Sequence, residues 1–289
     1  MAAFVNHLLC FGLGFSAKAL AARLAAKGWH ITGTSRSAAG AAAIRAMGYN
    51  AFIFDGTAAL PQQAFEGVSH IVVSAPPDTE GDPVLRRYAK LLATLASDVK
   101  WLAYLSTTGV YGDRDGGWVS EESQLQPTTE RGQRRLEAET AWQALGLPVH
   151  LFRLAGIYGP GRNQLVALME GTAKRILKPG QVFSRIHVDD VAGVLEASIT
   201  KPNPGAAYNV CDDEPCPPQD VVSYAAKLLG LPEPPGIAFE GAQLSAMARS
   251  FYTESKRVSN VRMKKELGVR LRYPNYREGL AALLQDLKR

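Results

Sequence analysis

Three small residues near the amino terminus are spaced for binding a dinucleotide. Gly12, Gly14 and Ala17 lie between an apolar run that ends at Phe11 and a helical pattern rich in alanine. In such a strand–turn–helix the first glycine allows the turn, the second admits a pyrophosphate, and the third small residue keeps the helix close to the strand. The helix amino terminus offers N–H groups and partial positive charge. The predicted phosphate-binding residues are Gly12, Gly14, Phe15, Ser16 and Ala17; the alternative is a glycine-rich turn without a ligand.

The end of the second predicted strand indicates which dinucleotide would bind. A site selective for NAD places a carboxylate there, where it accepts hydrogen bonds from the ribose hydroxyls. This chain instead has Ser35, Arg36 and Ser37. A guanidinium could pair with the 2′-phosphate of NADP, and the two hydroxyls could assist. We therefore predict NADP in preference to NAD, with a solvent-facing Arg36 as the alternative.

The elements that would position these residues alternate between strands and helices, which is typical of a parallel sheet. Gly28 and Gly48 follow two of the helices as capping residues. The sequence predicts an α/β fold with a doubly wound parallel sheet, the NAD(P)-binding Rossmann arrangement, and a smaller carboxy-terminal lobe. The predicted strands are 4–10, 29–34, 51–54, 69–75, 100–107 and 147–154, and the predicted helices are 16–27, 38–47, 83–97 and 128–145.

Length and composition are those of a globular protein with two parts. The chain has 289 residues, 46% hydrophobic and 20% charged, and lacks the uninterrupted apolar run of about 18 residues that a membrane span needs. The loop at 156–161 predicts a boundary. We expect a dinucleotide-binding domain over 1–157, to which 186–211 return, and a substrate lobe over 158–185 and 212–289. The amino terminus lacks the basic residues of a secretory leader, so we expect a cytoplasmic protein.

The histidines and cysteines do not predict a metal or catalytic centre. Ligands of an open α/β sheet bind beyond the carboxyl ends of its strands. Four histidines lie instead near strand starts, at His7, His30, His70 and His150. His187 lies in a predicted turn, so this argument does not apply to it. Three cysteines are too few for a disulfide framework or a zinc knuckle, so we predict core thiols at Cys10, Cys211 and Cys216.

The net charge of +5 comes from one segment. Eight Lys/Arg stand against two Glu between 245 and 272, and the rest of the chain is nearly neutral. This segment fits either an anionic small ligand or a solvated helix face. It lacks the interleaved aromatic residues of a nucleic-acid groove, so we expect no nucleic-acid partner.

Five further motifs follow the glycine turn in order: LSTTGVYG at 105–112, RLAGIYGPG at 153–161, IHVDDV at 186–191, YNV at 208–210 and LG at 267–268. With them the chain resembles the extended short-chain dehydrogenase/reductase superfamily, the NAD(P)-dependent epimerase/dehydratase-like proteins. The resemblance covers nearly the whole chain. It is stronger evidence for the fold than for the reaction.

The resemblance implies a catalytic Ser/Thr after the fifth strand and a Tyr-x-x-x-Lys pair on the next helix, where the tyrosine exchanges a proton as hydride moves. Thr107 matches the Ser/Thr position. Arg131 and Arg135 stand at the Tyr and Lys positions, because Gly132 aligns with the glycine after the tyrosine. A guanidinium stays protonated near neutrality, so we expect the pair's usual chemistry to be lost. The two arginines form either an anion-binding pair or a solvated face paired with neighbouring glutamates.

The remaining expectations concern the ligands and the reaction. The resemblance places Asp55 at the adenine ring, with an ordinary turn aspartate at the end of a strand as the alternative, and implies a homodimer. Ala75 and Tyr158 are also predicted to contact the dinucleotide. We predict an NAD(P)-binding protein without Tyr–Lys catalysis, whose second ligand is a small molecule, anionic if the basic segment binds it. One alternative is an active NADP-dependent epimerase, dehydratase or reductase of a nucleotide-sugar or similar anion. It would use Tyr158, Tyr111 or Tyr252 as a displaced acid/base. Another is a regulatory module that senses cofactor occupancy.

Overall fold

The computed structural model describes residues 6–288, which divide into two units. Unit 1 holds the described residues of 6–107, 133–153 and 191–208, and unit 2 holds 108–132, 154–190 and 209–288. This division differs from the predicted domains in four places. Four segments that were expected in the dinucleotide-binding domain group with unit 2: 108–132, 154–157, 186–190 and 209–211.

Unit 1 is built on a seven-stranded sheet with the order β11-β7-β5-β4-β1-β2-β3. The pairs β1–β2, β2–β3, β1–β4 and β4–β5 are parallel. This is the doubly wound strand order extended by one strand, which confirms the predicted fold class. The strands are β1 (His7–Phe11), β2 (His30–Ser35), β3 (Asn50–Ile53), β4 (His70–Val73), β5 (Trp101–Thr107), β7 (Val149–Leu154) and β11 (Ala207–Val210). Residues 4 and 5 of the first predicted strand lie outside the described residues.

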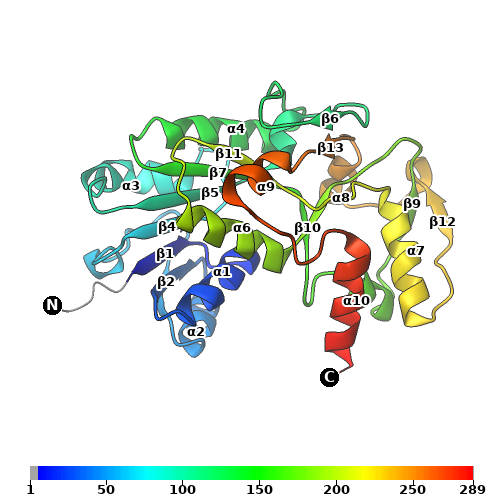
Figure 1. Ribbon diagram of the computed structural model, residues 1–289, viewed down its shortest axis with the longest axis horizontal. Helices are drawn as coiled ribbons and strands as arrows, with labels where there is room; N and C mark the ends of the chain where they lie inside the picture. Colours follow the sequence, from blue (N-terminus) through cyan, green and yellow to red (C-terminus); the bar gives the residue numbers. More distant parts are fainter. Residues whose placement is uncertain (1–5, 289) are drawn as a thin grey trace. The chain divides into compact units, whose positions relative to one another are not determined.

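Helices cover both faces of this sheet (Figure 1). On one face Arg23 of α1 pairs with Glu196 of α6 at 2.7 Å. On the other, the Trp142 indole of α4 donates to Asp82 at the start of α3, at 3.0 Å. The predicted helices of unit 1 are therefore present, with ends shifted by a few residues. The helices are α1 (Phe15–Ala25), α2 (Ala38–Ala46), α3 (Pro83–Thr94), α4 (Glu130–Gln143) and α6 (Val188–Thr200).

Alternate residues of the strands form the core under α3 and α4. Successive side chains of a strand point to opposite faces, so Leu9 and Phe11 of β1 share one face. They belong to a buried cluster with Tyr88 of α3 and Trp142 of α4. Cys10, between them, is buried as predicted, and so are the other two cysteines, all of them free thiols.

The histidines of the sheet lie at or near the amino ends of strands, as predicted. The His70 ring lies 4.5 Å from Trp29 and 6.3 Å from Trp101, whose ring is 5.9 Å from His150. Three of these histidines are buried: His7, His70 and His150. Burial lowers the pKa of each of these three, that of His70 to about 4. This edge therefore carries neutral imidazoles in a structural role.

Acidification should destabilise the protein through His70. The unfolded chain binds this proton below about pH 6.5 and the folded chain only near pH 4, so the free energy of unfolding falls as the pH falls between these values. We expect His70→Asn to remove on the order of 2 kcal/mol of this pH dependence. Urea unfolding at pH 7 and pH 4.5 measures it. His30→Asn, at an exposed histidine, is the control; equal pH dependence in all three proteins would contradict the prediction.

Unit 2 contains three short two-stranded pairs, β8–β10, β9–β12 and β6–β13, all parallel. Its helices α5, α7 and α10 share a core around Tyr158, Leu165 and Tyr276. Its strands are β6 (Trp118–Val119), β8 (Gly156–Tyr158), β9 (Arg175–Leu177), β10 (Arg185–His187), β12 (Gly236–Ala238) and β13 (Arg257–Val258). Its helices are α5 (Gln164–Met169), α7 (Pro218–Leu229), α8 (Ala246–Phe251), α9 (Val261–Leu267) and α10 (Tyr276–Leu287). Within residues 6–288, every helix is too short or too polar to cross a lipid bilayer.

Candidate functional site

The predicted glycine turn joins β1 to α1 at the carboxyl edge of the sheet. Gly12 has a φ of +85°, and a Cβ there would lie 3.2 Å from the Ala75 nitrogen. The turn is fixed to β2, because the Gly12 N–H donates to the Thr34 hydroxyl at 2.8 Å and the Leu13 N–H to the Thr34 carbonyl at 2.9 Å. The fold itself therefore requires glycine at position 12, because of the positive φ and the close packing.

The fold does not require glycine at position 14. Its φ of −88° suits any residue, and a Cβ there would have no atom within 4 Å. It is the N-cap of α1, which has no side-chain cap and no acidic residue in its first turn, all within the described chain. Ala17, by contrast, is fully buried. An open volume in front of an uncapped helix amino terminus fits an anionic group such as a pyrophosphate. Gly12, Gly14 and Ala17 could therefore hold the pyrophosphate of a dinucleotide.

At the end of β2, the side chain of Arg36 is free, whereas those of Ser35 and Ser37 contact the start of α2. Arg36 is exposed and has no hydrogen bond or ion pair with any of residues 6–288. The Ser37 hydroxyl caps α2 by accepting from the Gly40 N–H at 3.1 Å. Ser35 packs against the same turn, because a Cβ on Gly40 would lie 2.0 Å from its hydroxyl oxygen. Ser35 and Ser37 thus shape the start of α2, and Arg36 has the free cationic group.

Two further predicted cofactor contacts also lie at the carboxyl edge of the sheet. Ala75 follows β4 and is the residue on which the Gly12 turn packs. Asp55 follows β3, is exposed, and accepts from the Thr57 N–H at 2.9 Å and the Thr57 hydroxyl at 2.7 Å through one oxygen. Both hydrogen bonds lower the pKa of Asp55, and the one from the Thr57 hydroxyl has the larger effect. The side chain is therefore an ionised turn residue beside the nucleotide edge.

Arg135, at the position of the family's lysine, is fixed in the interior of unit 1. Its guanidinium donates to the Leu105 carbonyl at 2.7 Å and to the Tyr104 hydroxyl at 3.2 Å, and it lies 5.6 Å from the centre of the Tyr104 ring. Burial raises the pKa of Tyr104. Arg135 is buried, so the solvated helix face considered from the sequence does not apply to it. The same contacts bind it to β5.

The positions of the family's Ser/Thr and tyrosine fall in different units. Thr107 is the last residue of β5 and is partly exposed, in unit 1. Arg131 is exposed and belongs to unit 2, where its guanidinium lies 5.6 Å from the centre of the Phe251 ring of α8. A Cβ on the next residue, Gly132, would lie 2.8 Å from the Gly109 carbonyl oxygen. The start of α4 therefore packs closely on 108–111, and glycine is needed there.

A buried charged group beside Arg135 was not predicted from the sequence. Glu139 of α4 accepts a hydrogen bond from Ser106 and pairs with Arg153 of β7 at 2.8 Å. Glu139 and Arg153 are 2% and 5% exposed. The motif RLAGIYGPG thus begins with an arginine whose charge is neutralised inside unit 1. The sequence did contain a sign of this pair. Arg153 lies within the apolar strand HLFRL, and a buried charge needs a buried partner of opposite charge.

The three tyrosines considered as displaced acid/base groups all have structural contacts in unit 2. The Tyr111 hydroxyl is buried and donates to Asn209 at 2.7 Å. Tyr158 packs against α10, where its hydroxyl would lie 2.0 Å from a Cβ on Gly279, and burial raises its pKa. The Tyr252 ring lies 5.3 Å from that of Phe239. The surroundings of Tyr158 and Tyr111 argue against proton transfer to a ligand, and those of Tyr158 against its predicted cofactor contact.

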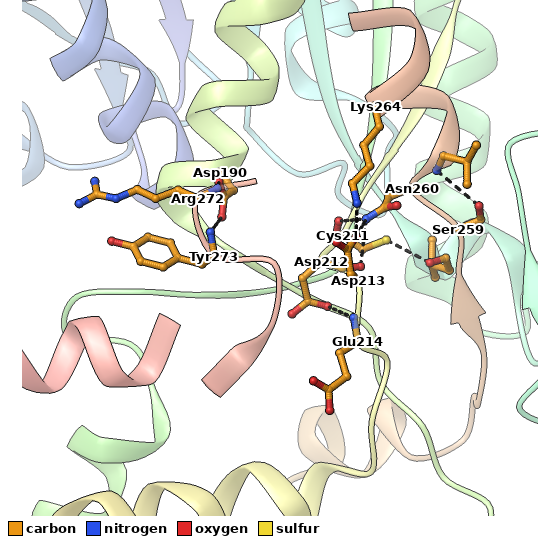
Figure 2. A network of polar contacts seen from close by, with 12 residues as sticks. Asp190, Cys211, Asp212, Asp213, Glu214, Ser259, Asn260, Lys264, Arg272 and Tyr273 are labelled. Carbon is orange, nitrogen blue, oxygen red and sulfur yellow. Dashed lines mark hydrogen bonds and ion pairs between the residues drawn. The ribbon is translucent and has the colours of Figure 1, made fainter. Parts of the chain in front are cut away.

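The motifs at 186–191 and 208–210 lead into a polar network in unit 2 (Figure 2). Asp190 accepts from the backbone N–H groups of Arg272 and Tyr273, at 2.7 and 3.0 Å. The Asn260 amide donates to the carbonyls of Cys211 and Asp212, at 3.0 and 3.2 Å. Burial raises the pKa of Asp212 to about 8. These contacts fix the backbone of the loop after β11 and of the segment before α10.

His187 belongs to the interior of unit 2. Its Nδ1 accepts from the Asp189 N–H at 3.1 Å, and its ring lies 4.2 Å from that of Tyr273 and 5.2 Å from that of Tyr158. Burial lowers its pKa. It is a packed, neutral imidazole.

Four of the eight cations of the basic segment form ion pairs within unit 2. These ion pairs are Lys256–Glu254 at 2.6 Å, Arg262–Glu266 at 3.0 Å, Arg272–Asp189 at 3.6 Å, and Lys264–Asp213. Arg249 donates to the Ala242 carbonyl at 2.8 Å. These cations therefore have partners within the protein, whereas Arg257 makes no ion pair among residues 6–288 and donates instead to the Gly116 carbonyl.

Comparison with known proteins places the fold and these motifs in one family. The model of the NAD dependent epimerase/dehydratase family matches residues 12–211, from the glycine turn to the residue after β11. The chain belongs to this family. The protein YeeZ of Escherichia coli K12 is 29% identical and aligns with 91% of this chain and 95% of its own.

Solved structures share the fold. A conserved protein of unknown function from Silicibacter pomeroyi is 53% identical, with a TM-score of 0.92 over 99% of this chain and 100% of its own. MoeE5, solved with UDP-glucose and NAD, is 21% identical, with a TM-score of 0.78 over 98% of each chain. The second likeness bears on the fold alone.

Proposed function

We propose that this family member binds NADP(H) at the glycine turn of unit 1 and does not carry out proton-coupled hydride transfer through a Tyr–Lys pair. The open volume at Gly14, in front of the uncapped start of α1, carries the proposal. Gly12, Phe15, Ser16 and Ala17 would complete the phosphate site. When bound, the nicotinamide supplies hydride donor or acceptor chemistry.

Arg36 supports the choice of NADP. It is exposed and unpaired among residues 6–288, and the short stretch around it, 35–37, contains no carboxylate that would repel a 2′-phosphate. An arginine–phosphate contact can be bidentate and charge-assisted. Asp55 and Ala75 would lie along the adenine and phosphate parts of the same edge.

Replacing Arg36 by alanine should weaken NADPH binding by about tenfold or more and leave NADH binding nearly unchanged, because only NADPH carries the 2′-phosphate. Fluorescence titration of both nucleotides measures this. Arg87→Ala, at an exposed arginine of α3 in the same unit, is the matched control. If Arg36→Ala and Arg87→Ala bind NADPH equally, the assignment to NADP fails; if the wild-type protein binds neither nucleotide, the proposed function fails.

The absence of a tyrosine and a lysine on α4 supports the second half of the proposal. A guanidinium has no acceptor and does not release its proton near neutrality, and Arg135 is fixed to β5 in addition. MoeE5 was solved with UDP-glucose and NAD, so UDP-glucose is a natural test substrate. We expect no transfer of hydride from UDP-glucose to NADP⁺; steady turnover would contradict the proposal.

The two alternatives from the sequence have their own tests. For an enzyme with a displaced acid/base, Tyr252 is the remaining candidate, and Tyr252→Phe would abolish kcat with any substrate that is turned over. For a cofactor-sensing module, a partner must bind differently to the protein with NADP⁺, with NADPH and without nucleotide. Neither alternative has an observation in its favour comparable to the open volume at Gly14.

A further inference from the structure

One residue of β2 holds the glycine turn of unit 1 by two hydrogen bonds. The Thr34 hydroxyl accepts from the Gly12 N–H at 2.8 Å, and the Thr34 carbonyl accepts from the Leu13 N–H at 2.9 Å. The carbonyl is common to every residue type, but the hydroxyl is not. Thr34 is 2% exposed, so an apolar side chain at this position would leave the Gly12 N–H facing a group that cannot accept a hydrogen bond.

The residue before Thr34 makes room for the same turn. A Cβ on Gly33 would lie 2.8 Å from both the Cβ and the Cδ2 of Leu13. Gly33 pairs with Cys10 of β1 and with Ala51 of β3, so the strand could not shift to admit a larger residue without disturbing both neighbours. Leu13 is 4% exposed and packs directly on the backbone of β2. The turn is thus held to β2 by hydrogen bonds at Thr34 and by packing at Gly33.

These contacts determine where the next residue of the turn lies. Gly14 follows Leu13 directly and is the N-cap of α1, where a Cβ would have no atom within 4 Å. The position of this open volume relative to β2 is therefore set by the contacts of Gly12 and Leu13. Arg36 follows Thr34 by two residues in the chain. The strand that carries the guanidinium thus also holds the turn.

We propose that Thr34 is a positioning residue of the dinucleotide site, whose buried hydroxyl fixes the glycine turn for the pyrophosphate, and that Gly33 supports it by admitting Leu13. Both residues act through the turn and not through a contact with the nucleotide. The inference rests on the proposed function, because the turn is the proposed phosphate site. Binding groups must be held within about 0.5 Å of their productive geometry, so loss of the hydroxyl weakens nucleotide binding.

Thr34→Val tests the proposal, because valine has nearly the shape of threonine and lacks the hydroxyl. We expect it to weaken the binding of NADPH and of NADH by a similar factor, about tenfold, since both nucleotides contain the pyrophosphate. Arg36→Ala, by contrast, should weaken NADPH alone. Thr34→Ser keeps the hydroxyl and should restore most of the affinity for both nucleotides. Gly33→Ala, which displaces Leu13, should weaken both nucleotides as Thr34→Val does. Fluorescence titration of the whole protein measures these affinities.

Thr32→Val is the matched control. Thr32 lies on the same strand, is 1% exposed, and its hydroxyl is hydrogen-bonded to the His7 ring at 2.8 Å, near the amino end of β1. Both valine variants should lower the midpoint of urea unfolding, because each leaves a polar group without its partner. Only Thr34→Val should change the affinity for the nucleotides.

Equal nucleotide affinity in Thr34→Val and the wild type would overturn the proposal. So would an equal loss of affinity in Thr34→Val and Thr32→Val, since reduced stability alone would then account for it. If Thr34→Val does not fold by circular dichroism, Thr34→Cys is compared with Thr34→Ser instead, because a thiol is a weak acceptor. Failure of this inference alone leaves NADPH binding by the wild type intact, whereas failure of the proposed function means that the wild type binds neither nucleotide.

Discussion

Replacing Glu139 by glutamine is expected to lower the free energy of unfolding by about 3–5 kcal/mol, because removal of one partner leaves a buried charge uncompensated. Arg153 is 5% exposed and holds the Glu139 carboxylate at 2.8 Å. Glutamine keeps the size of the side chain, so the loss would measure charge and not packing. The midpoint of urea unfolding, followed by circular dichroism, gives the value.

Glu137→Gln is the matched control. Glu137 lies on the same helix but is exposed, where it accepts from Gln133 at 3.0 Å, and we expect a change within about 0.5 kcal/mol. A triple variant, Glu139→Leu with Arg153→Met and Ser106→Ala, removes all three polar partners together and should recover most of the stability. A triple variant as unstable as Glu139→Gln would show that packing at this site outweighs the charge.

Replacing Gly14 by alanine should reduce NADPH affinity by about a hundredfold and change stability by less than about 1 kcal/mol. The backbone there already has a conformation open to alanine, and the new methyl group meets no protein atom within 4 Å. It would occupy the volume that a pyrophosphate needs. Fluorescence titration and urea unfolding of the same preparation separate the two effects.

Gly12→Ala is the contrasting variant. Its φ of +85° and the 3.2 Å approach to Ala75 predict a loss of stability as well as of binding. If Gly14→Ala bound NADPH as the wild type does, the volume in front of α1 would have another purpose and the proposed function would lose its main support.

Much of unit 1 was predictable because its information is local. Buried parallel strands read as short apolar runs, so β1, β2, β3, β4, β5 and β7 were found within a few residues of their observed ends. The glycine turn was found because its spacing lies within six residues. Unit 2 was not, since β6 and β13 pair Trp118 with Arg257, 139 positions apart in the chain, and two-residue strands have no pattern of their own.

In the candidate site, too, local features could be predicted from the sequence and distant contacts could not. Arg36 is identified by its neighbours in the sequence, because its position after a strand suffices. The role of Arg135 depends on a carbonyl of β5, thirty residues earlier, and no spacing rule connects them. Arg153 signalled a buried counter-ion but not which glutamate provides it. Sequence alone could thus indicate the family positions on α4, but not that Arg135 is bound to the strand.

The histidines at the amino ends of the strands imply that acid unfolding and ligand release coincide. His70, whose folded form gains its proton only near pH 4, lies at one edge of the sheet, and the glycine turn lies at the other. The turn itself, residues 12–17, contains no acidic, basic or histidine side chain. With NADH, which has no 2′-phosphate to titrate, the midpoint for losing the nucleotide on acidification should therefore equal the midpoint for losing the fold.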